Sequence, residues 1–133
     1  MRYLLDTNVV SHLARNPRGR VADRIKTIGE QNICTSIIVA AELRYGATKK
    51  ASPRLSVQVE AVLGAIDTVP FDSPANEFYG SIRTQLELAG TPIGANGLLI
   101  AAQALAFDHT LVTDNDHEFS RIDRLRVENW LRD

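Results

Sequence analysis

Two acidic residues stand where the surrounding pattern is apolar, and both could bind a cation. Asp6 directly follows the apolar segment Tyr3-Leu4-Leu5, and Glu42 lies in an otherwise apolar helical stretch. A buried carboxylate is unfavourable unless it is paired or bound to a cation. Asp6 could equally cap the helix that begins after it. Glu42 could equally face solvent or pair with Arg44 or Arg83.

A third acidic group lies near the end of the chain, after an apolar segment. The loop that follows Thr113 contains Asp114, Asn115, Asp116 and Glu118. Asn and Asp are common in solvated turns, which would explain the loop without any function. If the loop leaves the same sheet edge as Asp6, its acids add to one negative site, and such oxygen ligands suit Mg²⁺ or Mn²⁺.

The elements that must position these acids follow from hydrophobic periodicity and helix caps. Strands are predicted over 3–5, 32–35, 68–71, 110–113 and 125–127. Helices are predicted from residue 7 to the break at 16–19, around 21–28, over 37–48, from 52–53 to 66, from 73–74 to 90 and over 93–107. Strands that alternate with helices indicate an α/β fold, with a central parallel sheet flanked by helices.

A parallel sheet of this kind binds ligands beyond the carboxyl ends of its strands, at the point where the strand order changes direction. This rule places Asp6, Ser36 and the loop after Thr113 on one rim of the sheet. We therefore expect the acids to gather there, although they share no metal motif of fixed spacing.

Composition narrows the class of protein. The 133 residues suit one domain, and 44% hydrophobic with 23% charged residues is typical of a globular protein rather than a disordered one. The 15 Lys and Arg nearly balance the 16 Asp and Glu. The single Cys34 allows no internal disulfide, and with the three histidines it shows no zinc spacing. No apolar run approaches the roughly 18 residues of a membrane span, so we expect a cytoplasmic protein without membrane contact.

Four segments, in order, resemble the PIN-domain ribonucleases, and in particular the VapC-type toxins of toxin–antitoxin pairs. These are Leu4-Leu5-Asp6-Thr7-Asn8, Ala41-Glu42-Leu43-Arg44-Tyr45-Gly46, Gly90-Thr91-Pro92-Ile93-Gly94-Ala95-Asn96 and the stretch from Val112-Thr113 to Glu118-Phe119. The resemblance covers nearly the whole chain, so residues 1–133 are interpreted as a single PIN domain.

The resemblance implies a Mg²⁺- or Mn²⁺-dependent endoribonuclease that hydrolyses RNA phosphodiester bonds. In such enzymes the metal lowers the pKa of a bound water and stabilises charge that develops on phosphorus. Carried over by position, Asp6 and Glu42 correspond to metal-binding acids, and Asn115 to a site residue that Asp116 or Asp114 could supplement. Supporting roles fall to Thr113, Asn8 and Glu118.

The chain departs from the family pattern at residue 97. Relatives usually carry a third metal-binding aspartate where this sequence has Gly97. Asn96 is no simple substitute, because one step along a helix turns a side chain by about 100°. Gln103 also stands where relatives often have histidine. Because Mg²⁺ tolerates lost ligands poorly, we expect Gly97 to weaken or abolish cleavage.

The resemblance also implies partners: a VapB-type antitoxin, an RNA substrate and a second copy of the chain in a homodimer, with larger toxin–antitoxin assemblies possible. RNA must approach a negative pocket, so basic side chains are needed nearby. The candidates are Arg15, Arg18, Arg20 and Arg44. An ordinary solvated face explains any one of them about as well.

Two other readings stay open. With Gly97, the protein could be a binding module that engages its antitoxin or RNA without cutting. An acidic rim also suits a phosphate-handling α/β protein of receiver or hydrolase type, but no lysine follows the last strands as a receiver would need, and neither G-x-S-x-G nor a P-loop is present.

Overall fold

A five-stranded parallel sheet forms the centre of the protein. The structure, a computed structural model, describes residues 2–132. The strands are β1 (Tyr3–Leu5), β2 (Ile33–Ser36), β3 (Asp67–Val69), β4 (Thr110–Val112) and β5 (Val127–Glu128). Their spatial order is β3-β2-β1-β4-β5, and every neighbouring pair is parallel. The expected α/β fold with a parallel sheet is confirmed.

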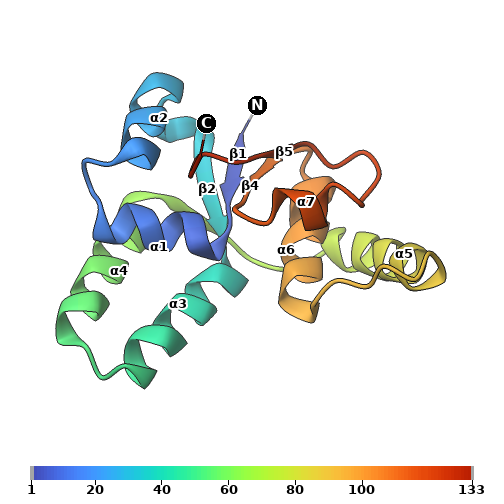
Figure 1. The fold of residues 1–133 in the computed structure, drawn as a ribbon, viewed down its shortest axis with the longest axis horizontal. Helices are drawn as coiled ribbons and strands as arrows, with labels where there is room; N and C mark the ends of the chain where they lie inside the picture. Colours follow the sequence, from blue (N-terminus) through green and yellow to red (C-terminus); the bar gives the residue numbers. More distant parts are fainter. Residues whose placement is uncertain (1, 133) are drawn as a thin grey trace.

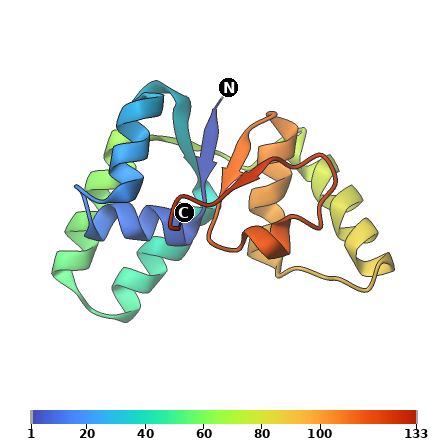
Figure 2. The same cartoon turned by 45° about the horizontal axis from the view of Figure 1, so that its top comes forward.

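Helices cover the two faces of this sheet. The helices of the described residues are α1 (Thr7–Arg15), α2 (Arg20–Ile28), α3 (Ile37–Lys49), α4 (Pro53–Ala65), α5 (Ala75–Leu88), α6 (Ala95–Ala106) and the short α7 (Asp116–Phe119). Helices α1 to α4 lie on one side of the sheet, and α5 and α6 pack together on the other (Figures 1 and 2). The connection from β3 to β4 therefore crosses to the opposite face from those that join β1, β2 and β3.

Helix caps fix where the site-bearing helices begin. The Ser36 hydroxyl accepts a hydrogen bond from the backbone N–H of Ile38 at 2.9 Å, and the Ser52 hydroxyl accepts one from Leu55 at 3.1 Å. Pro53 occupies the first turn of α4, where its missing N–H costs nothing. These caps confirm the helix starts expected at residues 36–37 and 52–53.

Two predicted strands end at other residues than expected, and one short helix was not predicted. The strand expected over 68–71 ends at Val69, because Pro70 has no N–H to extend the ladder. The last strand is Val127–Glu128 rather than 125–127. The acidic loop after Thr113 contains a helical turn, α7, that no apolar periodicity announced because it is only four residues long.

The core lies on both faces of the sheet and contains few polar side chains. Leu4, Leu5, Leu111 and Val112 of the two central strands are fully buried. Cys34 on β2 is also buried and free, and burial raises the pKa of its thiol to about 11, so the thiol is unreactive at neutral pH. No helix within residues 2–132 has the length and apolar character needed to cross a membrane.

Candidate active site

The carboxyl ends of β1 and β4 bring together two of the expected site residues. These strands are neighbours at the point where the strand order changes direction. Asp6 directly follows β1, and its backbone N–H donates to the carbonyl of Val112 at 2.8 Å. Thr113 directly follows β4 and is completely buried. The topology therefore creates the ligand-binding crevice that this fold type offers, and Asp6 lies in it.

Asp6 both caps α1 and faces the crevice. Its Oδ1 accepts from the backbone N–H of Thr7 at 2.8 Å, and its Oδ2 accepts from the Thr113 hydroxyl at 2.8 Å. Burial raises the pKa of this carboxyl, the two hydrogen bonds lower it, and the nearby charges of Glu42 and Glu118 raise it further. A carboxylate surrounded by like charges is one that a cation would stabilise.

Glu42 reaches the same crevice from α3. The hydroxyl of Thr7 donates to its Oε1 at 2.8 Å, so Thr7 joins the two acids through its backbone and side chain. The ion pairs considered for Glu42 do not form: Arg44 pairs with Glu60 at 2.9 Å and Arg83 with Glu87 at 3.1 Å. Glu42 therefore lines the crevice and forms no ion pair with either arginine.

The crevice is a cavity of about 220 Å³ whose wall contains acidic side chains and, among the described residues, no basic ones. Its lining combines three carboxylates, polar side chains from α1 and from the residue before α7, and apolar side chains from α6, the segment before it, and α7. The residues are Asp6, Thr7, Asn8, Glu42, Ile93, Gly94, Gly97, Ile100, Asn115, Glu118 and Phe119. This lining contains no lysine, arginine or histidine, so the described part of the wall offers no counter-charge to the acids.

Thr113 holds Asp6 and the following loop in place through its buried hydroxyl. Besides donating to Asp6, its hydroxyl accepts the backbone N–H of Asn115 at 3.0 Å. This second bond holds the start of the loop so that Asn115 and Glu118 line the cavity. Asn8 lines it from the first turn of α1. The structure thus brings Asp6, Glu42 and the expected supporting residues to one place.

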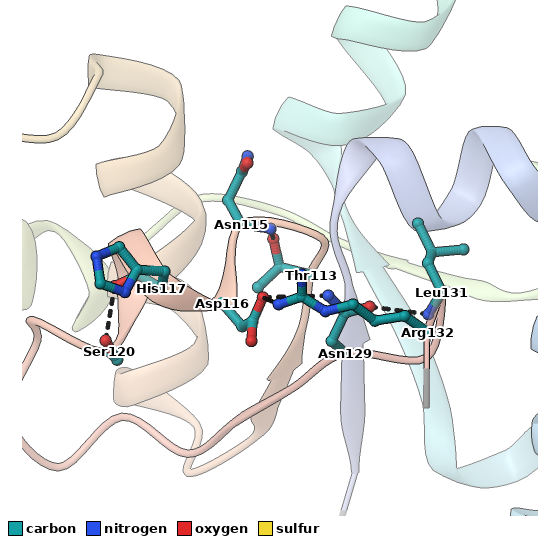
Figure 3. Close-up of polar contacts among 8 residues, drawn as sticks. All are labelled: Thr113, Asn115, Asp116, His117, Ser120, Asn129, Leu131 and Arg132. Atoms are coloured by element: carbon teal, nitrogen blue, oxygen red, sulfur yellow. Dashed lines mark hydrogen bonds and ion pairs between the residues drawn. The ribbon is translucent and has the colours of Figure 1, made fainter.

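Asp116 and Asp114 are not part of that wall, contrary to the expectation that either would supplement Asn115. The carboxylate of Asp116 accepts from Arg132 at 2.7 Å and from Asn129 at 3.1 Å, on the side of the loop away from Asn115 (Figure 3). The hydrogen bond from Asn129, followed by that from Arg132, lowers the pKa of Asp116. Adjacent residues in this turn point to opposite sides, which sequence order alone does not reveal.

Gly97 lies in the cavity wall and contributes no oxygen. It is the third residue of α6, and a Cβ built on it would stand 3.1 Å from Phe119 Cζ and 3.3 Å from Ile93 Cγ2. Within residues 2–132, no three His, Cys, Asp or Glu side chains are placed to hold one metal ion. The residues present therefore fit a divalent cation only in part: the charge is suitable, but the ligand set is incomplete.

Gln103 stabilises the packing of α6 against the sheet through hydrogen bonds. It is fully buried; its Oε1 accepts from the Ser36 hydroxyl, and its Nε2 donates to the carbonyls of Val69 at 3.2 Å and Pro70 at 3.0 Å. It ties α6 to the ends of β2 and β3. It is absent from the lining of the acidic cavity.

The four arginines expected to bind RNA are scattered. Arg44 is held by both oxygens of Glu60, and Arg20 donates to the carbonyl of Leu131 at 2.9 Å. Arg18 is exposed in the turn between α1 and α2. Arg15, at the end of α1, lines a separate cavity. None of the four lines the acidic cavity.

Sequence reasoning missed the residues that complete the cavity. Thr7 was read only as part of a motif, although a hydroxyl directly after a strand-end acid is a usable signal, because the first helical turn faces the same crevice. Phe119 and Ile93 are likewise named only within motif segments, with no role in the site. A larger apolar groove of about 730 Å³ between α1, α2 and α4 contains no convergent carboxylates, so the smaller acidic cavity is the better candidate for chemistry.

Comparison with known proteins identifies the family to which this fold and site belong. A family model described as the PIN domain matches residues 3–125. The chain is 37% identical over 132 residues to ribonuclease VapC2 of Rickettsia felis, with 98% of each chain covered. It is 32% identical to the tRNA(fMet)-specific endonuclease VapC of Shigella flexneri, again with 98% of each covered.

The fold agrees with the sequence comparison. The chain superposes on a crystal structure of VapBC2 from Rickettsia felis bound to a DNA fragment from their promoter, with a TM-score of 0.89 and 36% identity. The match covers 98% of this chain and 99% of that one. Similarity therefore extends over the whole fold and includes every element that lines the acidic cavity.

Proposed function

The chain belongs to the PIN-domain family and, within it, to the VapC-type ribonucleases, and from this premise we propose that it is the toxin of a type II toxin–antitoxin pair. The reaction is hydrolysis of RNA phosphodiester bonds at the acidic cavity. The observation that carries this proposal is the placement of Asp6, Glu42 and Glu118 around one cavity at the sheet switch point, with no basic side chain among the described residues that line it.

The roles of the chain's own residues follow from their contacts. Asp6 is oriented by Thr7 and Thr113, and Glu42 is oriented by the Thr7 hydroxyl. Two acids fixed in this way can bind a divalent cation, Mg²⁺ or Mn²⁺, through oxygen ligands. Asn115 supplies a neutral amide and Glu118 a further carboxylate at the wall.

Gly97 leaves this site without the metal-binding aspartate that the resemblance predicts at this position, so cleavage by the chain is weak or lost. The decisive comparison is between the chain and its Gly97→Asp variant, incubated with RNA and Mg²⁺ or Mn²⁺. Initiator tRNA is the first substrate to test, because one relative is named for tRNA(fMet). We expect at least about 100-fold faster cleavage by the variant, as is typical when a transition-state contact is restored.

A chain that cleaves as fast as its Gly97→Asp variant would contradict the role given to residue 97. If neither form cleaves but both bind RNA or antitoxin, the alternative of a non-cutting binding module is favoured. Calorimetric titration with Mn²⁺ separates these cases without any turnover, because the variant should bind the ion more tightly than the Gly97 chain.

The partner that we propose is a VapB-type antitoxin, because the solved relatives include VapBC complexes. The apolar groove between α1, α2 and α4 offers the contact surface, and Val57 in it is 70% exposed. Val57→Asp should weaken co-purification with the antitoxin, whereas Leu88→Asp, at an even more exposed apolar residue outside the groove, should not. We also propose a homodimer, which light scattering tests directly.

A further inference from the structure

A second cavity gathers basic side chains at the far ends of the helices that carry the site. It has a volume of about 410 Å³ and is lined by Arg15, Lys50, Ser52, Arg54, Leu55 and Gln58. Three of these residues carry a positive charge, and none carries a negative one. We call this the basic pocket.

The cations of the basic pocket have no acidic partner among the described residues. The ion pairs of the described residues engage other arginines, as with Arg44 and Glu60. Like charges that share a pocket repel one another, so their proximity contributes nothing to folding. A pocket of unpaired cations is suited to an anion, and Ser52 and Gln58 add neutral hydrogen-bonding groups.

Two helices connect this pocket to the acidic cavity. Helix α1 begins with Thr7 in the acidic cavity and ends with Arg15 in the basic pocket. Helix α3 carries Glu42, which lines the acidic cavity, and the C-cap residue of the same helix, Lys50, lines the basic pocket. Helix α4 lies beside the far ends of both (Figures 1 and 2).

The separation suits a nucleic-acid strand. Eight residues of helix, from Thr7 to Arg15 or from Glu42 to Lys50, span about 12 Å at about 1.5 Å per residue. A base-stacked strand rises about 3.4 Å per nucleotide along its helix axis, so three to four nucleotides cover that distance. An RNA whose cleaved bond lies at the acidic cavity can therefore place another phosphate of the same strand in the basic pocket.

We infer that Arg15, Lys50 and Arg54 form a binding site for a backbone phosphate of the RNA substrate, three to four nucleotides from the cleaved bond. This inference rests on the proposed function, and it assigns substrate contacts to that reaction. The acids alone would repel RNA, and the basic pocket supplies the missing attraction. Phosphate contacts position a strand without reading its sequence, so the pocket contributes affinity rather than base specificity.

The test measures the affinity of the Gly97 chain for fluorescent initiator tRNA by anisotropy, in EDTA, over a range of salt concentrations. The variant carries Arg15→Gln, Lys50→Gln and Arg54→Gln. The matched control carries Arg83→Gln, Arg121→Gln and Arg124→Gln, which also removes three positive charges but touches neither cavity. We expect the slope of log K against log salt to fall by about 2 in the variant, with binding about 100-fold weaker at 0.1 M salt.

Equal slopes in the variant and the control would overturn the inference. A second measurement uses the unaltered chain, so it decides the matter even if the variant fails to fold. Bound RNA should reduce acylation of the Lys50 amine at least about 3-fold and leave that of Lys26 unchanged. Equal protection of both lysines, or of neither, contradicts a phosphate site in the pocket.

Failure of this inference can be separated from failure of the proposed function. If Gly97→Asp cleaves tRNA while the basic-pocket variant keeps its salt slope, only the phosphate site is wrong. If that variant instead loses the antitoxin and keeps RNA binding, the pocket contacts a protein, which also overturns the RNA assignment. If no form binds or cleaves RNA, the proposed ribonuclease itself is wrong.

Discussion

Replacing Gly97 by aspartate would place a fourth carboxylate at a cavity that Asp6, Glu42 and Glu118 already line. In the absence of a cation, these charges repel one another, and the folded state must bring them together. We therefore expect Gly97→Asp to destabilise the protein in EDTA and to make its stability strongly dependent on Mg²⁺ or Mn²⁺.

The magnitude follows from three contributions. The new Cβ meets the Phe119 ring at 3.1 Å and Ile93 at 3.3 Å, which costs about 1 kcal/mol as the ring tip shifts. An acid in the first turn of α6 regains about 1 kcal/mol from helix propensity and the helix dipole. What remains is repulsion, which is about 1–3 kcal/mol for a nearest carboxylate at a separation of about 6 Å and an effective dielectric constant of about 80 to 20.

The assay is thermal unfolding of the Gly97 chain, Gly97→Asp and Gly97→Asn, each in EDTA and in excess Mn²⁺. Asparagine has the size of aspartate without its charge, so it isolates the steric contribution. At about 4 °C per kcal/mol for a chain of this length, the Asp variant should melt about 4–12 °C below the Asn variant in EDTA. An ion present at 100 times its Kd restores about 2.7 kcal/mol, or about 10 °C.

The reasoning is refuted if the Asp and Asn variants have the same Tm in EDTA and the same response to Mn²⁺. That result would mean that residue 97 does not share an electrostatic environment with Asp6 and Glu42. A larger Mn²⁺ response in the Gly97 chain than in the Asp variant would also refute it, because a complete ligand set would then exist without residue 97.

Three further outcomes are expected. The raised pKa of Asp6 means that its carboxyl group binds a proton more tightly in the folded state than in the unfolded state, so the contribution of Asp6 to stability falls as pH rises above the ordinary value of 3.8. In EDTA, the Asp6→Asn variant should therefore be more stable than the parent protein at pH 7. Melting curves below pH 3.8 should show no such advantage. Thr113→Val keeps the buried shape but leaves Asp6 Oδ2 and the N–H of Asn115 without this partner, at a cost of about 2–4 kcal/mol in urea unfolding, whereas the exposed Thr84→Val should cost less than about 1 kcal/mol. Gln103→Leu removes one buried and two partly buried hydrogen bonds and should cost about 3 kcal/mol or more. An unchanged urea midpoint would contradict the tie between α6 and the strand ends.

Much of the fold could be predicted because its signals are local. The segment Tyr3-Leu4-Leu5 reads as a buried strand, and Ser36 and Ser52 mark helix starts by the hydrogen bonds they accept. Alternation of such strands and helices indicates a parallel sheet. The shifted ends of β3 and β5 and the short α7 were less predictable, because so few residues carry no periodicity of their own.

The sequence by itself determined which residues are available for chemistry: the strand-end acid Asp6, the acid Glu42 on an apolar helix, and a glycine at position 97, where the resemblance predicts an acid. It also determined that Asp6 and the acidic loop after Thr113 lie at one edge of the sheet, since parallel strands end on the same side. Only the tertiary structure decided which charges remain unpaired. Arg44 turns to Glu60, and Asp116 turns to Arg132 and Asn129, because ion pairs depend on contacts between segments that periodicity does not encode.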